Sequence, residues 1–101
     1  MSYISLWRFE VKKENEEEFE HAYGQQGEWI TLFKQGKGYR RTLLIRDISK
    51  AGSFVTIDEW ESFEKFHRFK EEFNEQYYTL DRLFSTLTEN EIQLGEFESV
   101  D

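Results

Sequence analysis

The sequence predicts a ferredoxin-like α+β fold, in which a four-stranded antiparallel sheet carries two helices on one face. Three observations support this prediction. Four segments are rich in aromatic and β-branched residues, two longer segments have apolar residues at helical spacing, and the order along the chain is strand, helix, strand, strand, helix, strand. The 101 residues are enough for one core, so we expect a single domain over residues 1–101.

The first part of the chain predicts a strand followed by helical structure. Tyr3 to Val11 is aromatic and β-branched and alternates at its end, which is typical of a strand. Glu14 to Tyr23 places its apolar residues on one helical face, and Gly24 is positioned to end that helix. Glu28 to Gln35 repeats the helical spacing, so we expect a further short helix that ends near Gly36.

The middle of the chain predicts a β-hairpin followed by a long helix. Tyr39 to Asp47 and Ser53 to Trp60 have strand composition, and a short connection joins them. Ser62 is a suitable N-cap, after which apolar residues recur every seven positions, at Phe66, Phe73, Leu80 and Leu87. An unbroken helix of this length would span roughly 39 Å. We therefore expect a bend or break near Asn74.

The last predicted strand is Glu91 to Phe97. It contains three large apolar residues, at Ile92, Leu94 and Phe97, and Gly95 interrupts them. A glycine inside a strand pattern is typical of a β-bulge.

One face of the third strand is more apolar than a solvent-exposed surface. Alternation within Ser53 to Trp60 places four residues on that face, namely Phe54, Thr56, Asp58 and Trp60. Alternation alone does not say which side of the sheet meets the helices. We expect a partner to cover the apolar face, and a second copy of the chain in a C2 homodimer would do so.

Composition and charge exclude several classes of protein. With 13 Lys and Arg against 21 Asp and Glu, the net charge is −8, which argues against nucleic acid as a partner. The chain has no cysteine, which excludes disulfides, a thiol nucleophile and thiolate zinc sites. No apolar stretch approaches the roughly 20 residues of a membrane span. We expect a cytoplasmic protein that does not associate with membranes.

Asp58 is the most distinctive candidate for chemistry. It lies two positions from both Thr56 and Trp60 on one strand face, where bulky neighbours could raise its pKa and allow it to act as a base. The alternative is a structural carboxylate paired with a strand arginine, and four are available: Arg8, Arg40, Arg41 and Arg46. Both interpretations stay open at this point.

Trp60 and His67 each have a functional and a structural interpretation. Trp60 closes its strand and could stack on a planar ligand, or it could pack in the core. His67 stands at the border of the apolar stripe of its helix, four residues after Phe63, and faces either the cleft or water. The two histidines lack the spacing of a metal motif, so no metal site is expected.

Six segments that span nearly the whole chain resemble one family. They are FEVKK, EFEHAYG, GEWITLF, GYRRTLLIRD, TIDEWES and LTENEIQLGEF. In this order they resemble the antibiotic biosynthesis monooxygenase-like (ABM) proteins of the dimeric α+β barrel superfamily. The resemblance implies a homodimer of ferredoxin-like protomers, each with a cleft between its sheet and its helices.

The resemblance also implies a range of activities and a set of pocket residues. The wider family includes cofactor-independent oxygenases of polycyclic aromatics, quinol oxygenases, haem-degrading enzymes and members without an assigned reaction. Asp58 and His67 become the candidate catalytic residues, and Trp60, Tyr23 and Trp29 the candidate residues for substrate binding.

The haem-degrading branch is the one that the sequence disfavours. It uses an asparagine on the first strand, a tryptophan that ends the third strand and a histidine in the next helix. Only Trp60 matches, because Trp7 occupies the asparagine position and His67 comes about one turn too early. We therefore expect no cofactor and no haem bound through His67.

Two functions follow as expectations. The first is a cofactor-independent monooxygenase that acts on a small aromatic or quinone-like molecule. The alternative is a homodimer of the same fold that only binds a small molecule or has a structural role. The sequence leaves both open.

Overall fold

The structure, a computed structural model, describes residues 1–101 and follows the expected order of strands and helices. The strands are β1 (Tyr3–Val11), β2 (Tyr39–Arg46), β3 (Ser53–Trp60) and β4 (Thr88–Glu98). The helices are α1 (Glu16–Tyr23), α2 (Glu28–Phe33), α3 (Phe63–Glu72) and α4 (Asn74–Phe84), with short 3-10 turns at Lys13–Asn15 and Ser85–Leu87. The ferredoxin-like α+β fold is confirmed.

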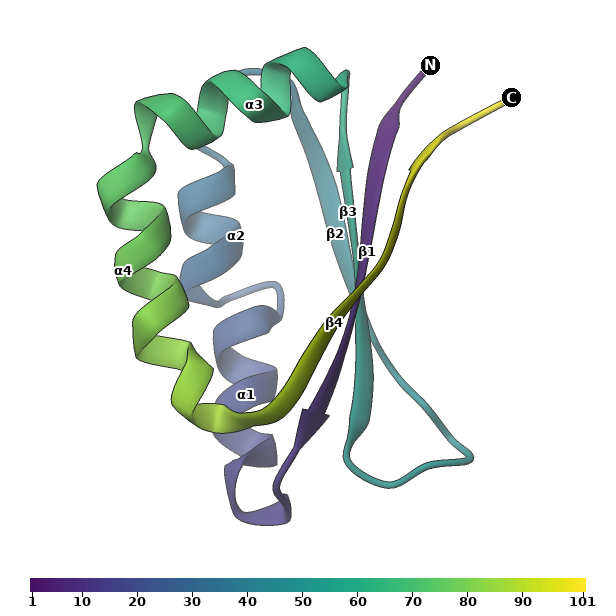
Figure 1. Cartoon of the computed structure of the whole chain (residues 1–101), viewed down its shortest axis with the longest axis vertical. Helices are drawn as coiled ribbons and strands as arrows, with labels where there is room; N and C mark the ends of the chain where they lie inside the picture. The colour runs from purple at the N-terminus through teal and green to yellow at the C-terminus, as the bar shows by residue number, and fades with distance from the viewer.

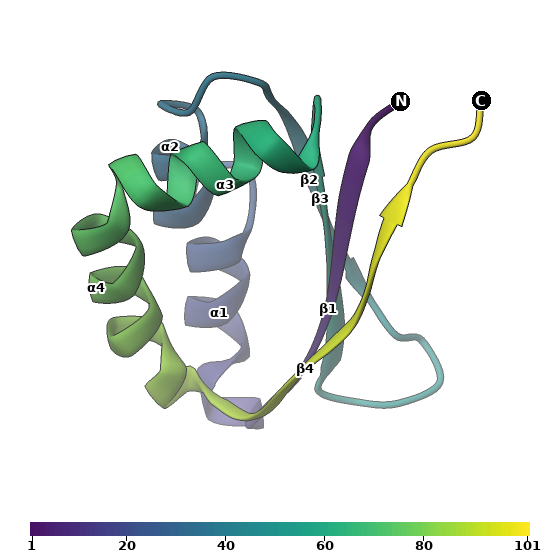
Figure 2. The same ribbon diagram turned by 45° about the horizontal axis from the view of Figure 1, so that its top comes forward.

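The strands form one antiparallel sheet in the order β2-β3-β1-β4. All four helices lie on the same side of this sheet, and the other face carries no helix (Figure 1). Figure 2 shows the same two layers from a second direction, with both chain ends at one end of the sheet. Ser99 N–H donates to the Ser2 carbonyl at 3.0 Å, which holds the two ends together.

The helices cover the sheet face that we expected a second copy to cover. Phe54, Thr56 and Trp60 on β3 are only 1%, 4% and 0% exposed, because α-helices pack on them. The prediction of which face is left for a partner is therefore wrong. The opposite face is the open one, and it exposes large apolar side chains from β2 and β4, namely Leu43, Ile45, Ile92, Leu94 and Phe97.

The long helix is broken where the sequence indicates. Ser62 caps α3 by accepting a hydrogen bond from the Lys65 N–H at 3.2 Å. Phe73, at φ −107° and ψ 30°, lies outside the helical region and separates α3 from α4. Its ring packs against Phe69, with ring centroids 5.4 Å apart. The break turns α4 sharply away from the direction of α3, so both helices stay over the core (Figure 1).

The bulge in the last strand is confirmed. Leu6 pairs with Gly95 but Trp7 pairs with Gln93, so Leu94 is an extra residue on β4. The strand itself is longer than predicted at both ends, because pairing with β1 continues from Thr88 to Glu98.

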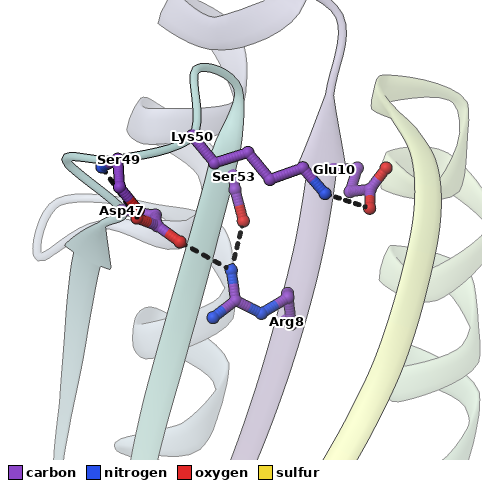
Figure 3. A network of polar contacts seen from close by, with 6 residues as sticks. All are labelled: Arg8, Glu10, Asp47, Ser49, Lys50 and Ser53. Carbon is purple, nitrogen blue, oxygen red and sulfur yellow. Dashed lines mark hydrogen bonds and ion pairs between the residues drawn. The ribbon is translucent and has the colours of Figure 1, made fainter.

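A network of polar contacts ties the β2–β3 loop to β1 (Figure 3). Arg8 donates to Asp47 at 3.1 Å and to the hydroxyl of Ser53, and Lys50 pairs with Glu10 at 3.1 Å. Two hydrogen bonds from Ser49, and then the hydrogen bond from Arg8, hold the pKa of the Asp47 carboxyl low, at about 2. The network occupies one of the strand arginines that could have paired with Asp58.

Candidate functional site

A cavity lies between the helices and the covered face of the sheet. Its volume is about 80 Å³, which is smaller than the usual range for sites that enclose a drug-sized ligand, and it opens to solvent on one side. All four strands and three of the helices contribute to its lining. The lining residues are Trp7, Phe9, Tyr23, Trp29, Phe33, Thr42, Thr56, Asp58, Tyr77, Asp81 and Glu91.

Aromatic rings form most of the cavity wall. Tyr23 at the end of α1 and Trp29 in α2 both line it, with ring centroids 6.1 Å apart. Tyr77 of α4 meets Trp29 edge to face at 5.1 Å. The Trp29 Nε1–H is buried and has no acceptor within the chain. The helical spacing thus places Tyr23 and Trp29, two of the sequence candidates, on the wall of one cavity.

Asp58 lies in the middle of the sheet, between two polar residues of the neighbouring strands. It pairs in register with Ser5 of β1 and Thr42 of β2, so its side chain points toward the helices. The Thr42 hydroxyl donates to Asp58 Oδ1 at 2.7 Å, and the Tyr39 hydroxyl donates to Thr42 Oγ1 at 2.9 Å. The second carboxylate oxygen of Asp58 makes no hydrogen bond within the chain and is left for the cavity.

The surroundings of Asp58 give it an unusual pKa. Burial raises the pKa from its ordinary value of 3.8 to about 6, and the hydrogen bond from Thr42 opposes part of that rise. Burial also raises the pKa of Tyr39, and that hydroxyl stays protonated as a donor. Asp58 is therefore a carboxyl that changes protonation state near neutral pH.

No arginine pairs with Asp58, so the structural alternative for this residue is wrong. Three of the strand arginines are paired with other acids: Arg8 with Asp47, Arg41 with Glu59, and Arg46 with Glu20. The nearest register partners of Asp58 are uncharged. The alternation of residues along the strands could not reveal that Asp58 lacks an arginine partner, because the arginine–acid pairs depend on the strand register and on the loop after β2.

Trp60 lies in the core and does not line the cavity. Its side chain is 0% exposed and packs among the rings of Phe33, Tyr39, Phe66 and Phe69. Gly36 leaves room for it, since a Cβ there would lie 3.0 Å from the Trp60 ring. The position at the end of β3 puts Trp60 under α3, which is why it meets helices instead of a ligand.

His67 lies on the outer surface of α3. Its side chain is 61% exposed, it stands 3.9 Å from the carboxylate of Glu71, and its ring stacks at 6.0 Å on Phe63. It does not line the cavity. His67 lies on the solvent-facing side of α3, because Phe66 and Phe69 occupy the side that faces the sheet.

Eight of the eleven lining residues were not among the sequence candidates. Four of the eight, namely Thr42, Tyr77, Asp81 and Glu91, come from β2, α4 and β4. Glu91 faces the helices because it pairs with Phe9, and no pattern in the sequence distinguishes it from a solvent-facing strand acid. Burial and the charge of Asp81 raise the pKa of Glu91, so the two carboxylates act on each other.

No group of three or more His, Asp or Glu side chains is arranged to bind a metal ion. No helix has the length and apolar composition needed to cross a membrane.

The fold and the cavity define a ferredoxin-like α+β protein with a small, mainly aromatic cavity between sheet and helices. The family model described as antibiotic biosynthesis monooxygenase matches residues 2–76. The chain belongs to this family.

Solved structures share the fold over almost the whole chain. A putative antibiotic biosynthesis monooxygenase from Bordetella bronchiseptica is 16% identical with a TM-score of 0.79, over 99% of this chain and 98% of that one. SnoaB, a cofactor-independent oxygenase from Streptomyces nogalater, is 20% identical with a TM-score of 0.73, over 99% and 94%. A putative family member from Deinococcus radiodurans is 14% identical with a TM-score of 0.74, over 98% and 93%. No curated protein sequence matches the chain.

Proposed function

We propose that the chain is a cofactor-independent monooxygenase of a small aromatic molecule, with Asp58 as its base. The observation that supports this most directly is the environment of Asp58. Its carboxyl has a pKa of about 6 and one oxygen free of hydrogen bonds, on the wall of an aromatic cavity. A base is most effective when its pKa lies near the working pH. The fold shared with SnoaB adds support for oxygenase chemistry.

A phenol with hydrogen on its para carbon illustrates the reaction. Ionised Asp58 accepts the hydroxyl proton, and the para carbon of the phenolate forms a bond to O₂. The proton returns to the outer oxygen and gives a hydroperoxide. Loss of the para C–H proton to Asp58 then breaks the O–O bond, leaving a carbonyl and hydroxide, which takes the proton as water. The phenol gives up four electrons, O₂ accepts them, and the products are a quinone and water.

The aromatic wall would hold the ring during this sequence. Tyr23, Trp29 and Tyr77 offer ring faces and edges for stacking, which is worth about 0.5–1.5 kcal/mol per pair beyond burial. Trp60 and His67 have no part in the proposal, because neither lines the cavity.

Oxygen uptake with 1-naphthol tests the proposal, because its oxidation product, 1,4-naphthoquinone, is detected by absorbance. General-base assistance contributes about 10²–10⁴ in rate, so Asp58→Asn should lower turnover at least about 10²-fold. Glu72→Gln, an exposed acid at the end of α3, is the matched control and should keep full activity. A fully active Asp58→Asn variant would remove the base assignment. Binding of 1-naphthol without oxygen uptake in the wild type would favour the non-catalytic binding function.

We further propose that the chain forms a homodimer through the open face of its sheet. That face exposes Leu43, Ile45 and Phe97 at 53%, 41% and 47%, next to the partly buried Leu6 and Ile57. A continuous apolar surface of this kind is typical of an interaction site. A second copy is the occupant proposed, because C2 pairing buries the same surface on both chains.

A further inference from the structure

We propose that the cavity selects an aromatic ligand that bears a protonated amine and rejects anionic ligands. The inference rests on the proposed function only in placing an aromatic molecule in this cavity. It adds the charge of that molecule, which neither the family nor the fold specifies.

The charged groups of the cavity are all acidic. Asp58, Asp81 and Glu91 line it, and no Lys, Arg or His does. None of the three carboxylates takes part in an ion pair within the chain. Lys70 Nζ lies 4.8 Å from the centroid of the Tyr77 ring, but Lys70 does not line the cavity. An anion in this cavity would meet only like charges.

The carboxylates of α4 and β4 are close enough to repel each other. Burial is the main cause of the raised pKa values of Glu91, Tyr23 and Tyr77; the charge of Asp81 adds to the rise at Glu91, and the charges of Asp81 and Glu91 add to the rise at both tyrosines. Their field therefore extends over the aromatic wall. A cationic group placed near Asp81 and Glu91 would relieve this repulsion and gain two favourable charge interactions.

The aromatic wall supports the same ligand in two ways. Ring faces attract cations, and Trp and Tyr, the rings with the strongest such attraction, are present at Trp7, Tyr23, Trp29 and Tyr77. Trp29 is also only 7% exposed, and its N–H, which lies beside the Tyr23 hydroxyl, makes no well-aligned hydrogen bond within the chain. An indole N–H can only donate, so an oxygen on the ligand would satisfy it. These features together favour a hydroxylated aromatic amine.

Asp81 and Glu91 belong to the part of the chain that the family model does not match. That match ends at residue 76, whereas Asp81 and Glu91 follow it in α4 and β4.

Three probes of similar shape and different charge test the inference. They are tyramine, a cation; 4-ethylphenol, which is neutral; and 3-(4-hydroxyphenyl)propanoate, an anion. Calorimetric titration at pH 7.5 and low salt should give an affinity for tyramine at least about tenfold above that for 4-ethylphenol, with the anion weakest. The preference should shrink as salt is added. Equal binding of the three probes, tightest binding of the anion, or no binding of tyramine would each overturn the inference.

Matched variants locate the selectivity. Asp81→Asn combined with Glu91→Gln should bring tyramine within about twofold of 4-ethylphenol, while Glu75→Gln, an exposed acid on the same helix α4, should leave the ratio unchanged. The single variant Asp81→Asn, at an exposed position, gives an intermediate ratio if the double variant folds poorly. A ratio that survives both substitutions would show that these carboxylates do not select the ligand.

The binding series is independent of oxygen chemistry. Tyramine preference without any oxygen uptake on 1-naphthol would reject the oxygenase function and leave the charge selectivity standing. Oxygen uptake without tyramine preference would reject the charge selectivity and leave the oxygenase function standing.

Discussion

Thr42 and Asp58 face each other across β2 and β3, and the threonine hydroxyl donates to the Asp58 carboxylate at 2.7 Å. The hydroxyl proton of Thr42 is committed to this bond because its oxygen already accepts a hydrogen bond from Tyr39. The pair therefore stabilises the ionised form of Asp58 against the burial that favours the protonated form. Thr42 is a positioning residue in this arrangement, and its role can be separated from that of Asp58.

Thr42→Val should raise the pKa of Asp58 further. The substitution keeps the shape of the side chain but removes the donor, and a hydrogen bond to a charged group is worth about 1.5–3 kcal/mol, so the pKa should rise by about 1–2. The acidic limb of the oxygen-uptake profile should move to higher pH by the same amount. Thr42→Ser keeps the hydroxyl and is the control. NMR titration of the Asp58 carboxyl measures the same change without activity, and an unchanged pKa in Thr42→Val would refute the role.

Asp58→Asn should stabilise the protein above pH 6. The pKa of Asp58 is higher in the folded chain, at about 6, than its ordinary value of 3.8, so the folded state binds the proton more tightly. The stability from this group is fully present below about pH 4 and is lost as pH rises through about 6. The loss is about 3 kcal/mol, because each pKa unit between the folded and ordinary values corresponds to about 1.4 kcal/mol. Urea unfolding at pH 5 and pH 8 should show a smaller difference for Asp58→Asn than for wild type. An equal difference in both proteins would contradict the raised pKa.

Leu43→Arg should separate the proposed dimer. Leu43 is 53% exposed on the open sheet face, where two copies of an introduced arginine would desolvate against apolar neighbours. Leu83→Arg is the control, because Leu83 is 57% exposed on α4, away from that face. Sedimentation at micromolar concentration should give twice the chain mass of 12.3 kDa for wild type and Leu83→Arg, and the chain mass for Leu43→Arg. A wild-type protein that sediments as a monomer would refute the dimer.

Trp60→Ala should destabilise the fold by about 3–5 kcal/mol, as truncation of a buried aromatic ring in a core does. Its ring contacts four other aromatic side chains and is fully buried. Tyr78→Ala, at an exposed aromatic residue of α4, should cost less than about 1 kcal/mol. Urea unfolding measures both. If Trp60→Ala kept its stability but lost affinity for tyramine, Trp60 would be a ligand-binding residue after all.

The sequence was sufficient for the elements because their signals are local. Alternation in β1 and β3, the cap at Ser62 and the glycine at Gly95 each act on residues that are neighbours in the chain. The break near Asn74 could also be expected, since an unbroken helix would have been too long for the domain. Tyr23 and Trp29 were correctly grouped as apolar helix residues, although only the resemblance of the chain to a family suggested that they line a cavity.

The tertiary structure decided the features that local sequence patterns leave open, namely which sheet face meets the helices and which charged residues pair. Alternation gives two faces of a strand but not which one meets the helices, and the helices covered Phe54, Thr56 and Trp60 because that choice buries the largest rings. The register of the four strands then set Thr42 beside Asp58 and placed Glu91 opposite Phe9 within the cavity. It also brought Arg8 and Arg41 next to Asp47 and Glu59, so that neither arginine pairs with Asp58. The sequence by itself determined the order and type of the elements, since these follow from neighbouring residues. Which carboxylates share the cavity depends on distances between strands and helices far apart in the chain, and only packing fixes those.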